Sequence, residues 1–211
     1  MNYKELDISL GRCLTGYFVQ NAFSGRGHQT ARRWERDAIN GDARHVIVTP
    51  CAPVRTGGGV VSCGVGIRFE TIETELAQLT AGSICFRPSG DTSTIGAALE
   101  KIVEPSREIL QWQLSDETSV KRACQEIGAL LMSFAIPWVD EMQTYTSAYH
   151  FLLQNLTARP NEGCVTAFRL ALLGTHIGVD MNEVVLRSLE QTIANDDIGA
   201  DVCRRILDRQ R

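Results

Sequence analysis

The chain has 211 residues, 44% of them hydrophobic, and a formal net charge of −4 at pH 7. This length and composition are sufficient for one substantial buried core and exclude a chain that is disordered throughout. The longest uncharged apolar run, residues 127–139, is shorter than the roughly 20 residues that a membrane-spanning helix needs. Pro137 also interrupts this run, so the sequence predicts no membrane helix.

Cysteine usage bears on the compartment of the protein. Seven cysteines are scattered along the chain without a Cys-x-x-Cys pair. Lys4 and Glu5 stand where a secretory signal would need an apolar run. An odd number of cysteines without such a signal predicts reduced thiols and a cytoplasmic protein. The spacing of cysteines and histidines does not fit a metal site, and we expect neither a metal nor a cofactor.

The charges are distributed unevenly along the chain. Residues 1–69 carry nine basic and five acidic side chains, a balance of +4, whereas residues 70–211 carry twelve basic and twenty acidic ones, a balance of −8. An asymmetry of this kind informs about partners and not about fold. It indicates an acidic rear half that would attract a basic partner.

The first 70 residues predict one helix and a β-meander. Apolar residues at spacings of three and four predict an amphipathic helix over residues 3–21. The segment RRWERDAINGDARHVIV (32–48) then changes to a period of two around Asn40-Gly41, which is typical of a tight hairpin turn. A third alternating strand over residues 60–69 completes the meander.

Three arginines and a tryptophan within five positions allow two interpretations of this hairpin. Arginines beside an aromatic ring can bind phosphates and stack on a base. The acidic balance of the whole chain disfavours a nucleic-acid partner. We therefore expect a structural hairpin in which the arginine stems cover apolar surface and pair with Glu35 or Asp37.

The rest of the chain predicts two further strands and a run of helices. Residues 116–134 show a helical stripe that ends at Phe134, and Pro137 opens another helix that reaches Leu156. Asp180 and Glu183 have the spacing of a capping box. The other expected elements are a helix at 70–79, a strand at 83–87, a surface loop at 88–94, a helix at 95–103, a strand at 110–115, and helices at about 163–176, 181–195 and 198–209.

Together these elements predict an α+β fold. We expect an antiparallel sheet of about five strands with flanking helices, followed by a C-terminal helical bundle. The polar stretch Arg159–Gly163 predicts a boundary between an α+β domain over residues 1–158 and a helical subdomain over residues 163–211.

The order of these segments resembles the bacterial proteins grouped as domain of unknown function 4304. The segments that carry the resemblance are GRGHQTARRWER, HVIVTP, GGGVVSCGVGIRFE, LQWQLSDET and FAIPWVDEM, and the similarity covers residues 1 to about 155. That family has no established catalytic residues. Small bacterial proteins of this kind include immunity partners of secreted toxins, so the resemblance implies a protein-binding role.

No catalytic residues are predicted. A Cys63–His45 nucleophile pair is conceivable, but Cys63 belongs to the apolar side of its strand, which favours a structural role. The carboxylate pairs Asp116-Glu117 and Asp140-Glu141 each lie in the first turn of an expected helix, where they complement the helix dipole. Adjacent helical positions do not face one another, so general acid–base work is disfavoured.

The charge asymmetry favours a noncatalytic binding protein, and most specifically an immunity protein that neutralises a basic toxin such as a nuclease through an acidic helical surface. The candidate interface residues are Asp116, Glu117, Asp140, Glu141, Tyr145, Asp196 and Asp197.

Two alternatives stay open. A small-molecule-binding protein or enzyme would need a pocket between sheet and helices near the arginine-rich hairpin, where His45, Arg32 or Asp91 would converge. A homo-oligomer could form through the aromatic helix that carries Tyr145 and Tyr149.

Overall fold

The computed structural model describes residues 2–28, 31–38, 41–55, 57–82, 93–106, 109–159, 164–195 and 199–209. The chain forms two compact units. Unit 1 comprises Met1–Ile67 and Gly96–Glu141, and unit 2 comprises Arg68–Ile95 and Met142–Arg211. This division differs from the predicted boundary at residues 158–163, because helices α2 (Glu70–Leu79) and α6 (Tyr145–Ala158) pack against α7 (Cys164–Ile177).

Unit 1 is built on the sheet, and the α+β class is confirmed. The described residues form seven strands where about five were predicted. The order β1-β2-β3-β4-β7 is antiparallel throughout, and β5 pairs with β3 and β6. The strands are β1 (Ser24–His28), β2 (Ala31–Asp37), β3 (Ala43–Pro53), β4 (Gly59–Val61), β5 (Gly64–Phe69), β6 (Ile95–Ala98) and β7 (Trp112–Leu114).

Two sequence predictions about strands need correction. The expected strand over residues 60–69 is divided at Ser62 and Cys63, where the Ser62 N–H donates to Pro50 O and the Cys63 carbonyl accepts from the Leu99 N–H. The expected helix over residues 95–103 begins instead as β6, and only Leu99–Val103 (α3) is helical. The predicted strand at 83–87 lies outside the described residues.

The arginine-rich hairpin is confirmed. Strands β2 and β3 pair from Ala31 opposite Pro50 to Asp37 opposite Arg44. Arg33 pairs with Glu35, and the Arg44 side chain lies 3.2 Å from Asp37. The turn uses the predicted glycine, because Gly41 has a φ of 81°.

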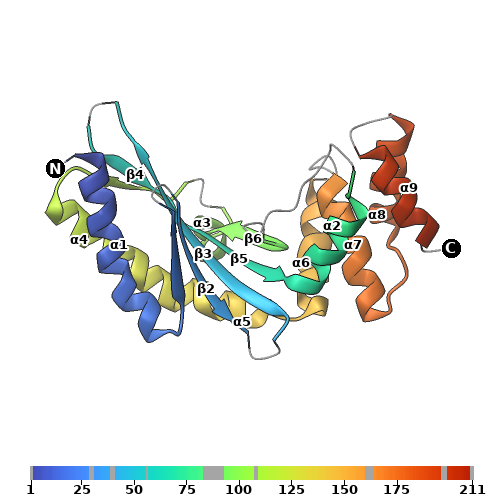
Figure 1. Cartoon of the computed structure of the whole chain (residues 1–211), viewed down its shortest axis with the longest axis horizontal. Helices are drawn as coiled ribbons and strands as arrows, with labels where there is room; N and C mark the ends of the chain where they lie inside the picture. Colours follow the sequence, from blue (N-terminus) through green and yellow to red (C-terminus); the bar gives the residue numbers. More distant parts are fainter. Residues whose placement is uncertain are drawn as a thin grey trace. The chain divides into compact units, whose positions relative to one another are not determined.

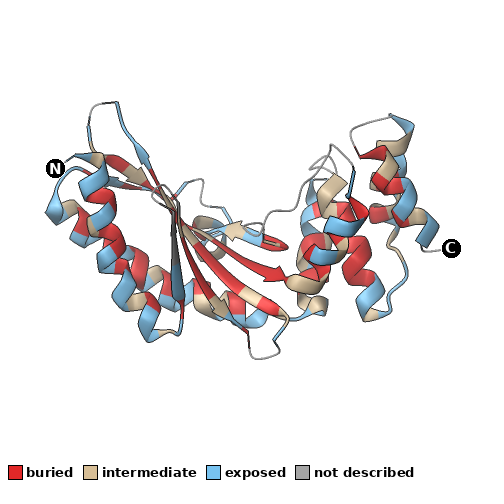
Figure 2. Ribbon diagram, in the orientation of Figure 1, coloured by how far each residue is buried: buried red, intermediate tan, exposed pale blue. Residues whose placement is uncertain are grey.

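Helix α1 (Tyr3–Gln20) covers one face of the sheet (Figure 1). It begins with a capping box between Asn2 and Glu5, in which each side chain accepts from the backbone N–H of the other. Its inner side is buried, as Figure 2 shows, and Phe18 stacks on Trp34 of β2 at 4.3 Å between ring centroids. The buried apolar residues of this side are Leu6, Leu10, Leu14 and Phe18.

A long helical segment lies beside α1. It consists of α4 (Glu117–Leu130), a π-helix η1 (Leu131–Ala135) and α5 (Ile136–Glu141). A disulfide between Cys13 and Cys124 joins α1 to α4. The prediction that the cysteines are all reduced is therefore wrong for this pair, because the fold brings together two cysteines that are 111 positions apart in sequence.

The turn between β3 and β4 offers a test of the fold. Gly57 and Gly58 both have positive φ, 97° and 83°, so alanine at either position costs about 1–2 kcal/mol of backbone strain. A Cβ at Gly57 would meet open space, whereas one at Gly58 would lie 2.1 Å from the Leu114 carbonyl oxygen of β7. Gly58→Ala should therefore cost roughly 1–3 kcal/mol more than Gly57→Ala in urea unfolding. Equal losses of unfolding free energy for the two variants would contradict the placement of Gly58 against the Leu114 carbonyl of β7.

In its described residues, unit 2 is mainly helical. Its helices are α2, α6, α7, α8 (Glu183–Ala194) and α9 (Ala200–Arg209). Glu73 of α2 is buried and binds Arg169 of α7 through both carboxylate oxygens, at 2.9 and 3.2 Å. The pair fixes α2 against α7, because removing either charge would leave the other buried and unpaired.

Two helix starts in this part of the chain differ from prediction. Asn182, and not Asp180, caps α8, since its side chain accepts from the Val184 N–H at 2.9 Å. The helix expected from Pro137 to Leu156 is two helices, because Thr144 caps a new helix, α6. Across the described residues no helix has both the length and the apolarity to cross a bilayer.

Candidate functional site

The predicted interface residues do not form one cluster. Asp116 and Glu117 lie at the start of α4, whereas Asp140 and Glu141 lie at the end of α5. At 1.5 Å per residue, the ends of this segment are roughly 36 Å apart. Tyr145 belongs to unit 2, and Asp196 and Asp197 lie outside the described residues.

At the start of α4 the carboxylates have structural roles. Asp116 is the N-cap, and hydrogen bonds from Ser119 lower its pKa. Glu117 lies 3.1 Å from Lys121 one turn later. The expectation that this pair stands in a first turn is confirmed, and both side chains remain exposed.

At the end of α5 the prediction of a first-turn position is wrong. Asp140 and Glu141 stand in the last turn, because α5 ends at Glu141. Asp140 pairs with Arg36 of β2, so its charge is partly neutralised. Glu141 is exposed.

Tyr145 is half-buried in the first turn of α6. Its ring meets Phe69 at 5.1 Å and His176 at 5.3 Å between centroids, both edge-on. The His176 Nε2 lies 2.7 Å from a Glu75 carboxylate oxygen. These contacts place Tyr145 in the packing of unit 2.

The two structural units do not carry the opposite net charges that the front and rear parts of the sequence carry. Unit 1 contains twelve basic and thirteen acidic residues, a balance of −1, and unit 2 contains nine and twelve, a balance of −3. The reason is that the acidic stretch 96–141 packs with the basic N-terminal part, as in the Arg36–Asp140 pair. An acidic half and a basic half therefore do not exist as separate bodies.

The structure reveals two exposed apolar side chains that sequence reasoning missed. Met132 and Phe134, 42% and 40% exposed, lie on η1. The helical pattern predicted Phe134 on the buried side. The wider π-turn shifts the register, so that Ala135 and Val139, in place of Phe134, continue the buried side from Leu131. No sequence signal marks this shift.

A buried polar cluster lies between α1 and the sheet. The Asp7 carboxylate is 3.0 Å from Arg32 Nη2, and the Cys51 thiol donates to Asp7. The Tyr3 hydroxyl donates to Cys51 O at 2.7 Å. Burial raises the pKa of Asp7 even though Arg32 and the thiol favour its charged form. Burial and Asp7 raise the pKa of Cys51 to about 11, so this thiol stays protonated.

His45 forms a second polar cluster on the same sheet face. Its Nδ1 accepts from Arg36 at 3.1 Å and lies 3.9 Å from Asp140. Burial, followed by the Arg36 charge, lowers the pKa of His45 to about 4. Arginine has only donors, so the imidazole is neutral and its proton is on Nε2. This ring does not supply a free base at neutral pH.

Four buried polar atoms on this face have no hydrogen-bond partner within the described residues. They are Arg32 Nη1, Trp34 Nε1, His45 Nε2 and Thr49 Oγ1. Arg32 is opposite Thr49 and Arg36 is opposite His45 in the β2–β3 register. Arg32 and His45 are thus separated by four residue pairs, roughly 13 Å, and do not converge. Asp91 lies outside the described residues.

The Cys63–His45 hypothesis finds little chemical support. Burial and the Glu100 charge raise the pKa of Cys63 to about 12, and the Nδ1 of His45 is occupied by Arg36. No group of three or more histidine, cysteine or acidic side chains able to hold a metal ion occurs in the part of the chain that the structure describes.

Comparisons with other proteins add no assignment. No protein-family model, curated protein or solved structure matches this chain. The resemblance to domain of unknown function 4304 therefore stays a prediction.

Proposed function

We propose that this protein is a noncatalytic binding protein that docks a basic protein partner on the outer side of residues 117–141. We call this surface the α4–α5 ridge and define it by Glu117, Met132, Phe134, Asp140 and Glu141. In its most specific form, the proposal is an immunity protein that covers a basic toxin.

The observation that carries the proposal is the exposure of Phe134 near the middle of the ridge, with Met132 exposed on the other flank of the same helical turn. Protein interfaces combine an apolar centre, enriched in methionine and aromatic residues, with a polar rim. Here the acidic residues at both ends of the ridge form the rim. Methionine also adapts its shape to a partner, and π-turns occur frequently at functional sites.

The carboxylates would act mainly on the rate of encounter. Glu117 and Asp140 are already paired with Lys121 and Arg36, so the attraction they offer is reduced. Glu141 is a second exposed carboxylate beside Asp140. We therefore expect the apolar centre to dominate affinity and Glu141 to contribute to association.

The test is co-purification with the product of an adjacent toxin-like gene. Phe134→Ala should weaken the complex by roughly 30-fold or more, as truncation of an interface hot spot does. Val179→Ala is the matched control, because Val179 is 45% exposed but belongs to unit 2. Absence of a complex at low salt, with a folded protein, would refute the proposal.

Charge reversal tests the rim separately. Glu141→Lys should slow association several-fold at low salt with little change in dissociation, and the effect should shrink as salt screens the charges. Glu190→Lys makes the same charge change on α8 of unit 2 and should leave the kinetics unaltered. Stopped-flow or surface-based kinetics over a salt series separates the two rates. A dominant effect on dissociation would count against this role.

A further inference from the structure

Helix α1 and its C-cap Asn21 lie beside α4 and the first turn of η1, and three contacts at a constant offset in sequence join them. Cys13 is bonded to Cys124, and Asn21 Nδ2 lies 3.1 Å from the sulfur of Met132, each pair 111 positions apart. Between them, the Tyr17 ring covers Gly128, where a Cβ would lie 2.7 Å from the ring. Because the contacts advance by one helical turn on both helices, α1 and α4 run parallel and in register.

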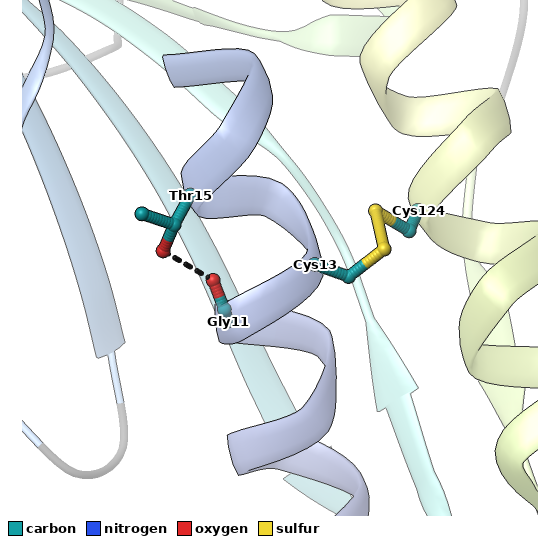
Figure 3. Close-up of a disulfide and its surroundings, with 4 residues drawn as sticks. All are labelled: Gly11, Cys13, Thr15 and Cys124. Carbon is teal, nitrogen blue, oxygen red and sulfur yellow. Dashed lines mark hydrogen bonds between the residues drawn. A yellow bond between two sulfur atoms is a disulfide. The ribbon is translucent and has the colours of Figure 1, made fainter. Parts of the chain in front are cut away.

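The disulfide is the covalent member of this series, and its two ends differ in exposure. Cys13 is exposed on α1, whereas Cys124 is fully buried on α4. Figure 3 shows the bond bridging the two helices, with Cys13 projecting from α1 toward α4. An external thiol can therefore approach the bond from the Cys13 side and not from the Cys124 side.

We propose that Cys13–Cys124 is a site of thiol–disulfide exchange with an external protein or small-molecule dithiol, and that the exchange controls the pairing of α1 with α4. The inference does not rest on the proposed function, because it concerns the helix pair alone.

The chemistry proceeds in two displacements. A thiolate of the dithiol attacks Sγ of Cys13, the Cys13–Cys124 bond breaks, and its electron pair goes to the Cys124 sulfur, which takes up a proton. The second thiol of the reagent, as thiolate, then displaces Cys13, which is protonated in turn. The dithiol is oxidised to a disulfide by two electrons, and the protein gains two thiols.

Burial of Cys124 sets the kinetics of the first step. A thiolate is destabilised in apolar surroundings, so the buried Cys124 sulfur is a slow leaving group. Reduction should therefore be slow in the closed helix pair and faster when α1 opens locally. The reduced protein keeps the Tyr17–Gly128 and Asn21–Met132 contacts and the buried side of α1, so it loosens at α1 without unfolding.

Thiol counting tests the exchange. Protein equilibrated with an oxidised dithiol should show five reactive thiols in denaturant, seven cysteines less the bonded pair, and seven after dithiothreitol. Peptide mapping of the alkylated protein should assign the difference to Cys13 and Cys124. Finding both as free thiols after the oxidising treatment would overturn the proposal.

Amide hydrogen exchange tests the control of pairing. Dithiothreitol should accelerate exchange in residues 10–18 of α1 by about tenfold or more and lower Tm by roughly 5–15 °C. Cys13→Ser should reproduce the reduced behaviour and show no response to dithiothreitol, since Cys13 is exposed and serine adds no buried polar group. Unchanged α1 exchange after verified reduction, or a Cys13→Ser protein that still responds, would overturn the proposal.

Discussion

Replacing Asp7 with leucine is expected to lower the free energy of unfolding by about 3–5 kcal/mol, because it leaves the Arg32 guanidinium buried without its carboxylate. Asp7 is 6% exposed and the Arg32 side chain 15% exposed. Gly11 of α1 makes room for this guanidinium, since a Cβ there would lie 2.2 Å from Arg32 Nε. Chemical denaturation of the purified variant measures the loss.

Two further variants show whether the loss comes from leaving Arg32 buried and unpaired or simply from removing a charged side chain. Asp7→Leu combined with Arg32→Met removes both charges and should recover most of the stability, because buried ion pairs and apolar replacements differ little in net stability. Arg187→Met breaks the exposed Arg187–Glu183 pair on α8 and should cost less than about 1 kcal/mol. If Asp7→Leu lowers the free energy of unfolding no more than Arg187→Met does, the placement of Asp7 and Arg32 in a buried cluster under α1 is wrong.

Acidification from pH 6.5 to 4 is expected to remove about 3 kcal/mol of stability through His45 alone. The pKa of His45 falls from 6.5 in the unfolded chain to about 4 in the folded protein, so the unfolded state binds the proton first as the pH falls. The full contribution of neutral His45 to the free energy of unfolding is present above pH 6.5, and it is lost as the pH falls toward 4. The magnitude follows from 1.36 kcal/mol per pH unit.

The contribution of His45 is the difference between the wild-type curve and that of His45→Asn. Asparagine can still accept from Arg36 but does not titrate in this range. Asp140→Asn removes the carboxylate that raises the pKa of His45 and should deepen the loss at low pH. Parallel curves for the wild type and His45→Asn between pH 4 and 6.5 would show that His45 is not buried beside Arg36.

The His45 cluster also affects how the binding proposal can be tested. Asp140 belongs both to the α4–α5 ridge and to the His45 cluster, so reversing its charge would change stability as well as partner binding. Glu141 is exposed and is the cleaner probe of the rim. Stability and affinity therefore have to be measured on the same variants.

Local patterns predicted much of the fold but only part of the candidate site. The helix at residues 3–21 and the hairpin around Gly41 follow from the spacing of neighbouring residues, and both are confirmed. A regular helix with 3.6 residues per turn places Phe134 on the buried side, whereas η1 is wider. One inserted π-turn was enough to place the apolar centre of the ridge on the surface.

The sequence by itself determined the α+β class, the helix and strand periods, and the structural role of Asp116, because each depends on residues within a few positions of one another. Only the tertiary structure decided the Cys13–Cys124 bond, the division into two units and the balance of charge on each. These depend on segments up to 111 positions apart, whose pairing is set by the packing of whole helices and strands and not by local propensity.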